Sequence, residues 1–210
     1  MSEKFVERAV EVLLKLKKTK VVMWDIKPPF LQDIRLVFKH TLGENQELID
    51  YYSKYVNYHD SLLIKAKKIA VAVNERLTYE SDLKNFGRIE RWLRPIEIHK
   101  GNLKDDCDGY ACLISHLLRL FGAHPWESWV WAGYAIKDDL SLEGHATAMV
   151  YDRVSDGFYP IEGSLYPDRA LNNLGKVQMK DNKNYSNKIF FITNDWVSYT
   201  DTPWGLKITI

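Results

Sequence analysis

Residues 106–121 read Asp-Cys-Asp-Gly-Tyr-Ala-Cys-Leu-Ile-Ser-His-Leu-Leu-Arg-Leu-Phe, and Gly122 follows them. From Ala111 onward, apolar side chains recur at the spacing of one buried helix face. The stretch therefore predicts a buried helix over Cys107–Phe121, with Gly122 as its stop signal. Cys107 falls in the first turn, where unpaired N–H groups and a partial positive charge stabilise a thiolate. We expect Cys107 to be a nucleophile.

A cationic partner is needed beside this cysteine, because the nearby aspartates raise a thiol pKa. Of six histidines, His145 stands out because it follows Gly144 and begins a predicted strand. His116 lies about two and a half helical turns from Cys107, which is too far for a base. The other four are expected to be surface residues: His40, His59, His99 and His124.

A hairpin selects the group that would orient His145. Residues 152–157 read Asp-Arg-Val-Ser-Asp-Gly, a turn signal between predicted strands over 145–151 and 158–164. We expect the turn to be centred between residues 154 and 155. Every cross-strand pair follows from that centre.

This register puts His145 opposite Ser164. It also puts Thr147 opposite Glu162, so Glu162 becomes a diagonal neighbour of His145 on the same face of the sheet. Asp152 lies seven residues along the strand, roughly 23 Å away at about 3.3 Å per residue, and points to the other face. Glu162 is therefore the predicted acid.

These residues resemble the transglutaminase-like, papain-related cysteine enzymes. The match lies in Asp-Cys-Asp-Gly-Tyr-Ala at 106–111, Gly-His-Ala at 144–146 and Tyr-Pro-Ile-Glu at 159–162, with Arg-Trp-Leu-Arg-Pro-Ile-Glu at 91–97 upstream. The resemblance covers residues 88–165. It implies a nucleophile-bearing helix packed on a small antiparallel sheet, and a triad of Cys107, His145 and Glu162. The family usually has Asp where this chain has Glu162.

The resulting function is a cysteine peptidase or amidase that acts on a peptide or protein. Cys107 would attack a carbonyl carbon to give a thioester, while His145 moves the proton and Glu162 holds the imidazole. The oxyanion would meet the Cys107 backbone N–H and one upstream donor. Asn102 and the indole of Trp92 are both candidates for that donor, and the sequence does not separate them.

Two other functions stay open on the same fold. An amine acceptor in place of water would make the protein a transglutaminase. A non-catalytic module would instead bind a protein partner through the amphipathic N-terminal helix over residues 1–18 and the tryptophan-rich sheet.

We expect no metal and no cofactor. Asp106-x-Asp108-Gly109 fails as a calcium loop of the helix–loop–helix type, because Lys104 and Ser115 would occupy positions that need carboxylates. A zinc site is weighed and disfavoured because the usual paired-ligand spacing is absent. Its ligands would be Cys107, Cys112, His116 and His145.

Hydrophobic periodicity predicts helices first and an antiparallel sheet afterwards, which is an α+β fold of papain or transglutaminase type. Residues 79–106 are expected to be mostly loop. Further helices are expected over 45–57 and 60–78, the second capped by Asp60-Ser61, and strands over 129–134, 145–151, 157–163, 188–193 and 205–210. We expect one domain over 1–210, made of a helical extension (1–80), a catalytic core (88–165) and closing strands (166–210).

Composition limits the partners and the compartment. The 210 residues are 46% hydrophobic and 27% charged with a net charge of +1, which does not favour a nucleic-acid partner. No stretch has the 18 or so uncharged apolar residues that a membrane span needs. Two cysteines and the absence of a signal-peptide pattern at the start predict a cytoplasmic protein with free thiols.

Overall fold

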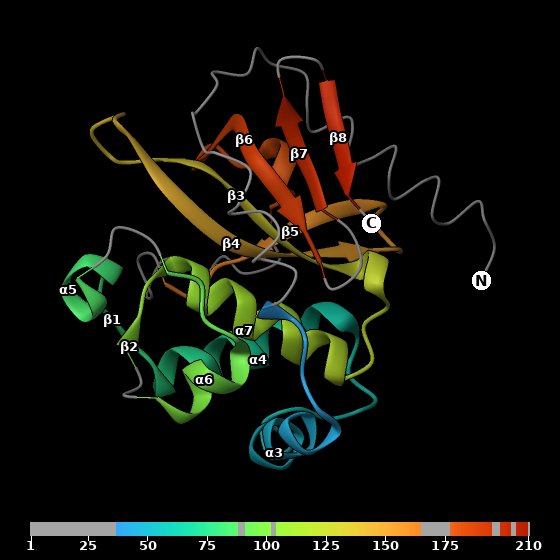
Figure 1. Ribbon diagram of the computed structural model, residues 1–210. Coiled ribbons are helices and arrows are strands. Elements are labelled where there is room, and N and C mark those ends of the chain that lie inside the picture. Colours follow the sequence, from blue (N-terminus) through green and yellow to red (C-terminus); the bar gives the residue numbers. More distant parts are fainter. Residues whose placement is uncertain are drawn as a thin grey trace.

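A six-stranded antiparallel sheet forms one layer of the molecule, and helices pack below it in Figure 1. The structure is a computed structural model that describes residues 37–87, 91–101, 104–164, 177–194, 198–202 and 205–209. The strand order is β5-β4-β3-β6-β7-β8. The strands are β3 (Ser128–Ile136), β4 (Leu142–Asp152), β5 (Gly157–Ile161), β6 (Tyr185–Thr193), β7 (Ser198–Thr202) and β8 (Gly205–Thr209).

The helices precede the sheet in the chain, as the sequence predicts. They are α3 (Leu42–Tyr52), α4 (Leu62–Arg76), α5 (Asp82–Phe86), α6 (Pro95–Lys100) and α7 (Cys107–Leu120), with 3-10 turns η1 (Pro125–Glu127) and η2 (Met179–Asp181). A short parallel pair, β1 (Thr78–Tyr79) and β2 (Lys104–Asp105), lies directly before α7. Within the described residues, no helix combines the length and apolar character that crossing a membrane requires.

Side-chain alternation along β4 divides the apolar residues between two cores. Ala148 and Val150 face the helices, where they pack with Leu113 and Leu117 of α7. Met149 faces the opposite side and joins a second cluster built on tryptophans of β3. Each fully buried leucine contributes about 1.5–3 kcal/mol, so α7 is fixed firmly between α4 and the sheet.

The start of α7 and the register of the hairpin formed by β4 and β5 are as predicted. The other limits differ, because α7 ends at Leu120, β4 begins at Leu142 rather than at 145, and β5 ends at Ile161 rather than at 163. Helix α7 begins at Cys107, and Gly122 has φ +97°, the left-handed conformation that its role as a stop signal requires. Strands β4 and β5 pair with Tyr151 opposite Phe158 and Asp152 opposite Gly157. That register is the predicted one, because a turn centred between residues 154 and 155 gives the same pairs.

Some boundaries differ from the prediction for local reasons. Helix α3 covers 42–52 rather than 45–57, because Thr41 and Glu44 form a capping box that starts it early. Strand β7 was not expected, since Ser198–Thr202 is polar and shows no apolar alternation. The helix expected over residues 1–18 lies outside the described residues.

The prediction of a mostly irregular segment over 79–106 is wrong. Helices α5 and α6 and strand β2 lie inside it. Pro95 occupies the first turn of α6, where a missing N–H costs nothing, and Gly87 ends α5 in a left-handed conformation with φ +67°. Glycine and proline are common in loops, but here Gly87 marks the end of α5 and Pro95 the start of α6.

Candidate active site

Cys107 is the first residue of α7. Asp106 precedes it as the N-cap and accepts a hydrogen bond from the Asp108 N–H at 3.4 Å. The Cys107 side chain is partly exposed, whereas Cys112 is buried one and a half turns further along the same helix. The backbone N–H of Ala146 donates to the Cys107 sulfur at 3.4 Å, which joins the start of α7 to β4 beside His145.

His145 and Glu162 form a hydrogen-bonded pair. Their Nε2 and Oε2 atoms are 2.7 Å apart, and both residues are buried. Glu162 directly follows the last residue of β5, so continuing the ladder puts it opposite Thr147 on the same face as His145. The structure thus brings together the two residues that the predicted register makes diagonal neighbours.

Asp152 and Asp156 form hydrogen bonds within the hairpin turn. The Asp152 carboxylate accepts hydrogen bonds from the N–H and hydroxyl of Ser155, at 3.0 and 2.6 Å. Asp156 has φ +50° and accepts a hydrogen bond from the Tyr151 hydroxyl. These contacts fix the turn, and the turn sets the register that presents Glu162 to His145.

Glu162 accepts hydrogen bonds at both carboxylate oxygens. Ser164 donates to Oε1 from its N–H at 2.9 Å and its hydroxyl at 3.0 Å. The hydroxyl of Tyr185, at the start of β6, donates to Oε2 at 2.9 Å. Sequence analysis missed Tyr185, because the apolar run that marks this strand begins only at residue 188.

The environment of the Cys107 thiol favours its protonated form. Burial raises the pKa of the thiol well above its usual range, and the Asp106 and Asp108 carboxylates raise it further. The Ala146 N–H acts in the opposite direction by stabilising a thiolate. The opposition between aspartates and thiolate that the sequence indicates is therefore present in the structure.

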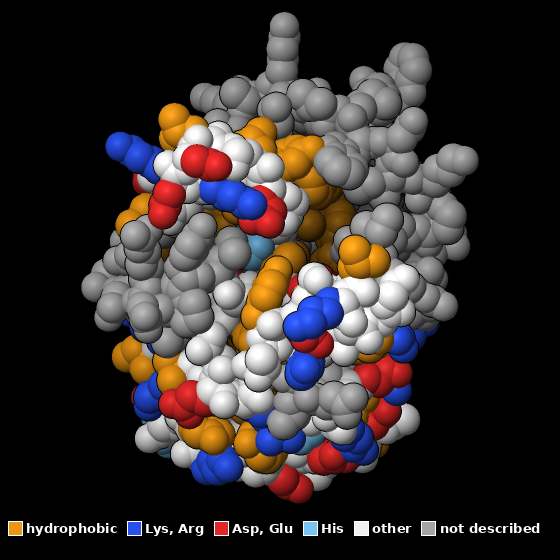
Figure 2. All heavy atoms as spheres, turned by 90° about the vertical axis from the view of Figure 1, so that its left-hand side faces the viewer, with side chains coloured by type: hydrophobic (Ala, Val, Ile, Leu, Met, Phe, Trp, Pro, Cys, Tyr) orange, Lys and Arg blue, Asp and Glu red, His pale blue; other side chains and the backbone are white. Residues whose placement is uncertain are grey.

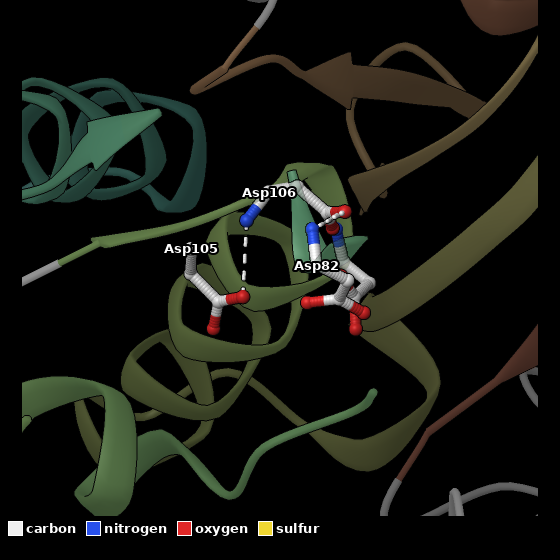
Figure 3. Close-up of side chains that lie close together, drawn as sticks. Asp82, Asp105 and Asp106 are labelled. Atoms are coloured by element: carbon white, nitrogen blue, oxygen red, sulfur yellow. Dashed lines mark hydrogen bonds between the residues drawn. The ribbon is translucent and has the colours of Figure 1, made fainter. Parts of the chain in front are cut away.

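Four aspartates gather beside this cysteine, and three of them are buried: Asp82, Asp105 and Asp108, with Asp106 partly exposed. Each offers a carboxylate oxygen, and these four oxygens all lie within 4.8 Å of one another. Figure 3 shows two of the internal hydrogen bonds, from the Asp106 N–H to Asp105 at 3.0 Å and from the Asp82 N–H to Asp106 at 3.2 Å. Asp82 comes from α5, so the spacing around residue 106 alone could not indicate this group.

The four-aspartate cluster is short of hydrogen-bond donors. Asp105 Oδ2 and both side-chain oxygens of Asp108 are buried without a hydrogen-bond partner. Burial raises the pKa of Asp105 to about 7 and the pKa of Asp108 well above its usual range. Carboxylate oxygens in this number are the ligands that a hard cation such as Ca²⁺ takes.

The four residues that were weighed as zinc ligands do not form a group in the described part of the chain. Among the described residues, the four aspartates are the one group of three or more potential ligand residues close enough to hold a metal ion. His116 instead lies with Nε2 2.9 Å from Asn45 Oδ1 and stacks on His40. His145 bonds Glu162, and Cys112 is buried in the core.

Of the two oxyanion-hole candidates, Trp92 lies among the described residues and Asn102 does not. Trp92 packs against the apolar cluster that Cys107 also contacts, and its ring lies 5.5 Å from that of Phe191. The role of Trp92 as an oxyanion donor stays a prediction.

A hollow lies on the face that carries β1, β2 and α5. Figure 2 shows hydrophobic side chains along this hollow and a histidine side chain in its depth, with charged side chains on the rim. The exposed ring of Tyr79 belongs to β1, the strand that pairs with β2 immediately before Cys107. An extended chain approaching this face would meet hydrophobic side chains along the hollow.

A helix that presents a cysteine to an antiparallel sheet carrying histidine and acid defines the α+β fold of the papain and transglutaminase type. The solved structures that resemble this chain include LapG of Legionella pneumophila. Its calcium-bound form superposes with a TM-score of 0.55 at 14% identity, covering 83% of this chain and 88% of LapG. An EGTA-treated form gives 0.52 at 15% identity, covering 80% and 84%.

The likeness is one of fold. No protein-family model matches the sequence, and no curated protein matches it. At 14–15% identity, the arrangement of helices and strands is what the two chains share.

Proposed function

We propose that this protein is a cysteine peptidase whose triad is Cys107, His145 and Glu162. The 2.7 Å hydrogen bond between His145 and Glu162, one residue from the N–H that reaches the Cys107 sulfur, carries the proposal. Because Glu162 engages Nε2, Nδ1 is the imidazole nitrogen that takes the thiol proton. The fold shared with LapG adds support, since it presents a cysteine on a helix to a sheet that carries histidine and an acid.

The reaction follows from these positions. The Cys107 sulfur bonds to the carbonyl carbon of an amide as its proton passes to His145. The resulting oxyanion accepts a hydrogen bond from the Cys107 N–H and from one upstream donor, Trp92 or Asn102. The C–N bond then breaks, the proton leaves with the amine, and a thioester remains. Water, deprotonated by His145, hydrolyses the thioester and regenerates the thiol.

Replacing each cysteine separately tests the nucleophile. Cys107→Ala should abolish both labelling by a thiol-directed probe and cleavage of a peptide panel. Cys112→Ala is the matched control, because it removes a sulfur from the same helix that is buried in the core. Equal loss of cleavage in both variants, with both still folded, would contradict the assignment.

The acceptor is tested in the same assay with a fluorescent primary amine added. We expect release of a free carboxylate and no incorporation of the amine, since the proposal has water as the acceptor. Efficient incorporation would favour a transglutaminase instead. A wild-type thiol that is neither labelled nor able to cleave any peptide would favour a non-catalytic binding module.

We also propose that the four-aspartate cluster binds calcium. The buried oxygens of Asp105 and Asp108 that lack hydrogen-bond donors support this site. The calcium-bound and EGTA-treated forms of LapG show that calcium is relevant to a protein of this fold. A bound divalent cation would offset the mutual repulsion of the carboxylates beside Cys107.

Thermal unfolding after EGTA treatment tests the calcium site without reference to activity. Calcium at about 100 times its Kd should stabilise the wild type by about 2.7 kcal/mol, which raises Tm by about 5 °C or more. Asp82→Asn should remove most of this shift, because it takes away one ligand without altering a neighbour of Cys107. Asp139→Asn, in the exposed β3–β4 turn, is the control and should keep the full shift. Equal shifts in both variants, or none in the wild type, would contradict the site.

A further inference from the structure

Tyr185 contacts both the histidine and the acid of the proposed triad. Its hydroxyl donates to Glu162 Oε2, the same oxygen that lies 2.7 Å from His145 Nε2. Its ring stacks on the His145 ring, with centroids 6.2 Å apart and an interplanar angle of 25°. Tyr185 reaches this position from β6, which pairs with β3 rather than with β4 or β5.

The tyrosine is held in one orientation and in one protonation state. Trp131, buried in β3, meets its ring edge-on at 5.2 Å and 81°. Burial raises the pKa of the Tyr185 hydroxyl well above its usual range, and the nearby Glu162 charge raises it further. The hydroxyl therefore keeps its proton and acts as a donor to the carboxylate.

Glu162 needs such a donor because its side chain has more freedom than that of aspartate. Its carboxylate follows two methylene groups, so its oxygens can sample several positions unless both are held. Ser164 holds Oε1 with two hydrogen bonds. On the Oε2 side, the hydroxyl of Tyr185 joins the His145 contact from a separate strand.

We infer that Tyr185 is a positioning residue of the active site, which fixes Glu162 and the His145 ring in the geometry that proton transfer requires. This inference rests on the proposed peptidase function. An acid that orients the imidazole acts mainly on turnover rather than on substrate binding. Loss of the Tyr185 hydroxyl should therefore lower kcat and leave KM nearly unchanged.

Tyr185→Phe removes the hydroxyl and keeps the ring. We expect kcat to fall about fivefold to tenfold with KM within about twofold of the wild type. Tyr159→Phe is the matched control: Tyr159 is buried, and its hydroxyl donates to Ser155 Oγ at 3.0 Å, in the hairpin turn. Equal kcat values for the two variants would overturn the inference.

A double-mutant cycle with Glu162→Gln separates positioning from general damage to the fold. If Tyr185 acts through Glu162, adding Tyr185→Phe to Glu162→Gln should lower kcat by less than about twofold further. A full additional loss of fivefold or more would show that the tyrosine acts by another route, which overturns the inference.

A readout without turnover keeps this inference distinct from the peptidase proposal. In ¹⁵N-histidine-labelled protein, the Nε2 proton of His145 should give a low-field NMR signal that broadens in Tyr185→Phe and persists in Tyr159→Phe. If the signal broadens in Tyr185→Phe but the protein shows no Cys107-dependent cleavage, the peptidase proposal fails, while the tyrosine link (the positioning of Glu162 and His145 by Tyr185) stands. An unchanged signal in Tyr185→Phe, with cleavage intact, would remove the tyrosine link alone.

Discussion

Two buried polar clusters adjoin Cys107, and they differ in how completely their oxygens are paired. Around Glu162, donors from Ser164, His145 and Tyr185 serve both carboxylate oxygens. In the four-aspartate cluster, Asp105 and Asp108 keep buried oxygens without a hydrogen-bond partner. The carboxylate oxygens of the first cluster are fully paired within the protein, whereas the second cluster needs a proton or a cation to offset its charge.

The difference follows from the cost of burying charge. A buried carboxylate keeps its charge only where donors replace the water that it loses, and otherwise its pKa rises. Asp105 and Asp108 show this rise, and the charges of Asp106 and Asp108 also disfavour a thiolate at Cys107. The Glu162 cluster is thus suited to hold an imidazole. The four-aspartate cluster is suited to change its charge when a proton or a cation binds.

The largest expected effect comes from crowding the aspartates. A Cβ at Gly109 would overlap the carboxylate of Asp105, which is buried and has little room to move. Gly109→Ala should therefore lower the free energy of unfolding by about 1–3 kcal/mol, measured in urea, and weaken any calcium-induced shift in Tm. Gly43→Ala is the control, since its Cβ would meet only Thr41 Oγ1 at 4.0 Å. Comparable losses in both variants would contradict crowding as the cause.

A third polar group, the stacked pair of partly buried His40 and buried His116, extends the comparison because burial favours its uncharged form. Burial, together with the neighbouring charges of His40 and Arg119, lowers the pKa of His116 to about 3. Burial also lowers the pKa of His40, against the opposing charges of Glu44 and Glu97 and with the help of Arg94. At His116, the unfolded state therefore binds more protons than the folded state between pH 6.5 and about 3.

Stability that depends on neutral His116 is present above pH 6.5 and is lost as the pH falls toward 3. The slope for this group is at most about 1.4 kcal/mol per pH unit. Urea unfolding from pH 7 to pH 4 should give a flatter curve for His116→Gln than for the wild type. His59→Gln, at an exposed position, should reproduce the wild-type curve. Identical slopes in all three proteins would refute this account.

The donor-rich cluster is probed by Glu162→Gln, which should lower kcat at least about tenfold with the fold preserved. The kcat of Glu162→Asp should lie between those of Glu162→Gln and the wild type. Asp152→Asn should change stability by no more than about 0.5 kcal/mol and leave kcat near the wild type, because an amide oxygen can still accept from Ser155. A strongly reduced kcat in Asp152→Asn, with a kcat near the wild type in Glu162→Gln, would show that the acid is misassigned.

The sequence predicts this hairpin well because local rules determine it. The turn residues at 152–157 and the two-residue period of β4 fix a register in which one slip would reverse every side chain. The same rules locate the start of α7, where Cys107 lies. These signals need no knowledge of distant parts of the chain.

The parts of the candidate site that the sequence did not predict come from segments distant in the chain. Asp82 reaches the four-aspartate cluster because β1 pairs with β2, a two-residue ladder too short to leave a pattern. Tyr185 precedes the apolar run of β6, so its strand was expected to begin three residues too late. Neither contact can be derived from spacing, because each depends on how separate elements pack.

The place of β6 in the sheet has a consequence for the order in which the chain is made. β3 lies between β4 and β6, so one of its edges stays open until residues 185–193 have left the ribosome. An open central edge is a template for pairing with another nascent chain. Cys107, His145 and Glu162 are all synthesised before Tyr185. The growing chain therefore holds the residues of the proposed triad before β6 is made, and translation of β6 both pairs the open edge of β3 and brings Tyr185 to Glu162.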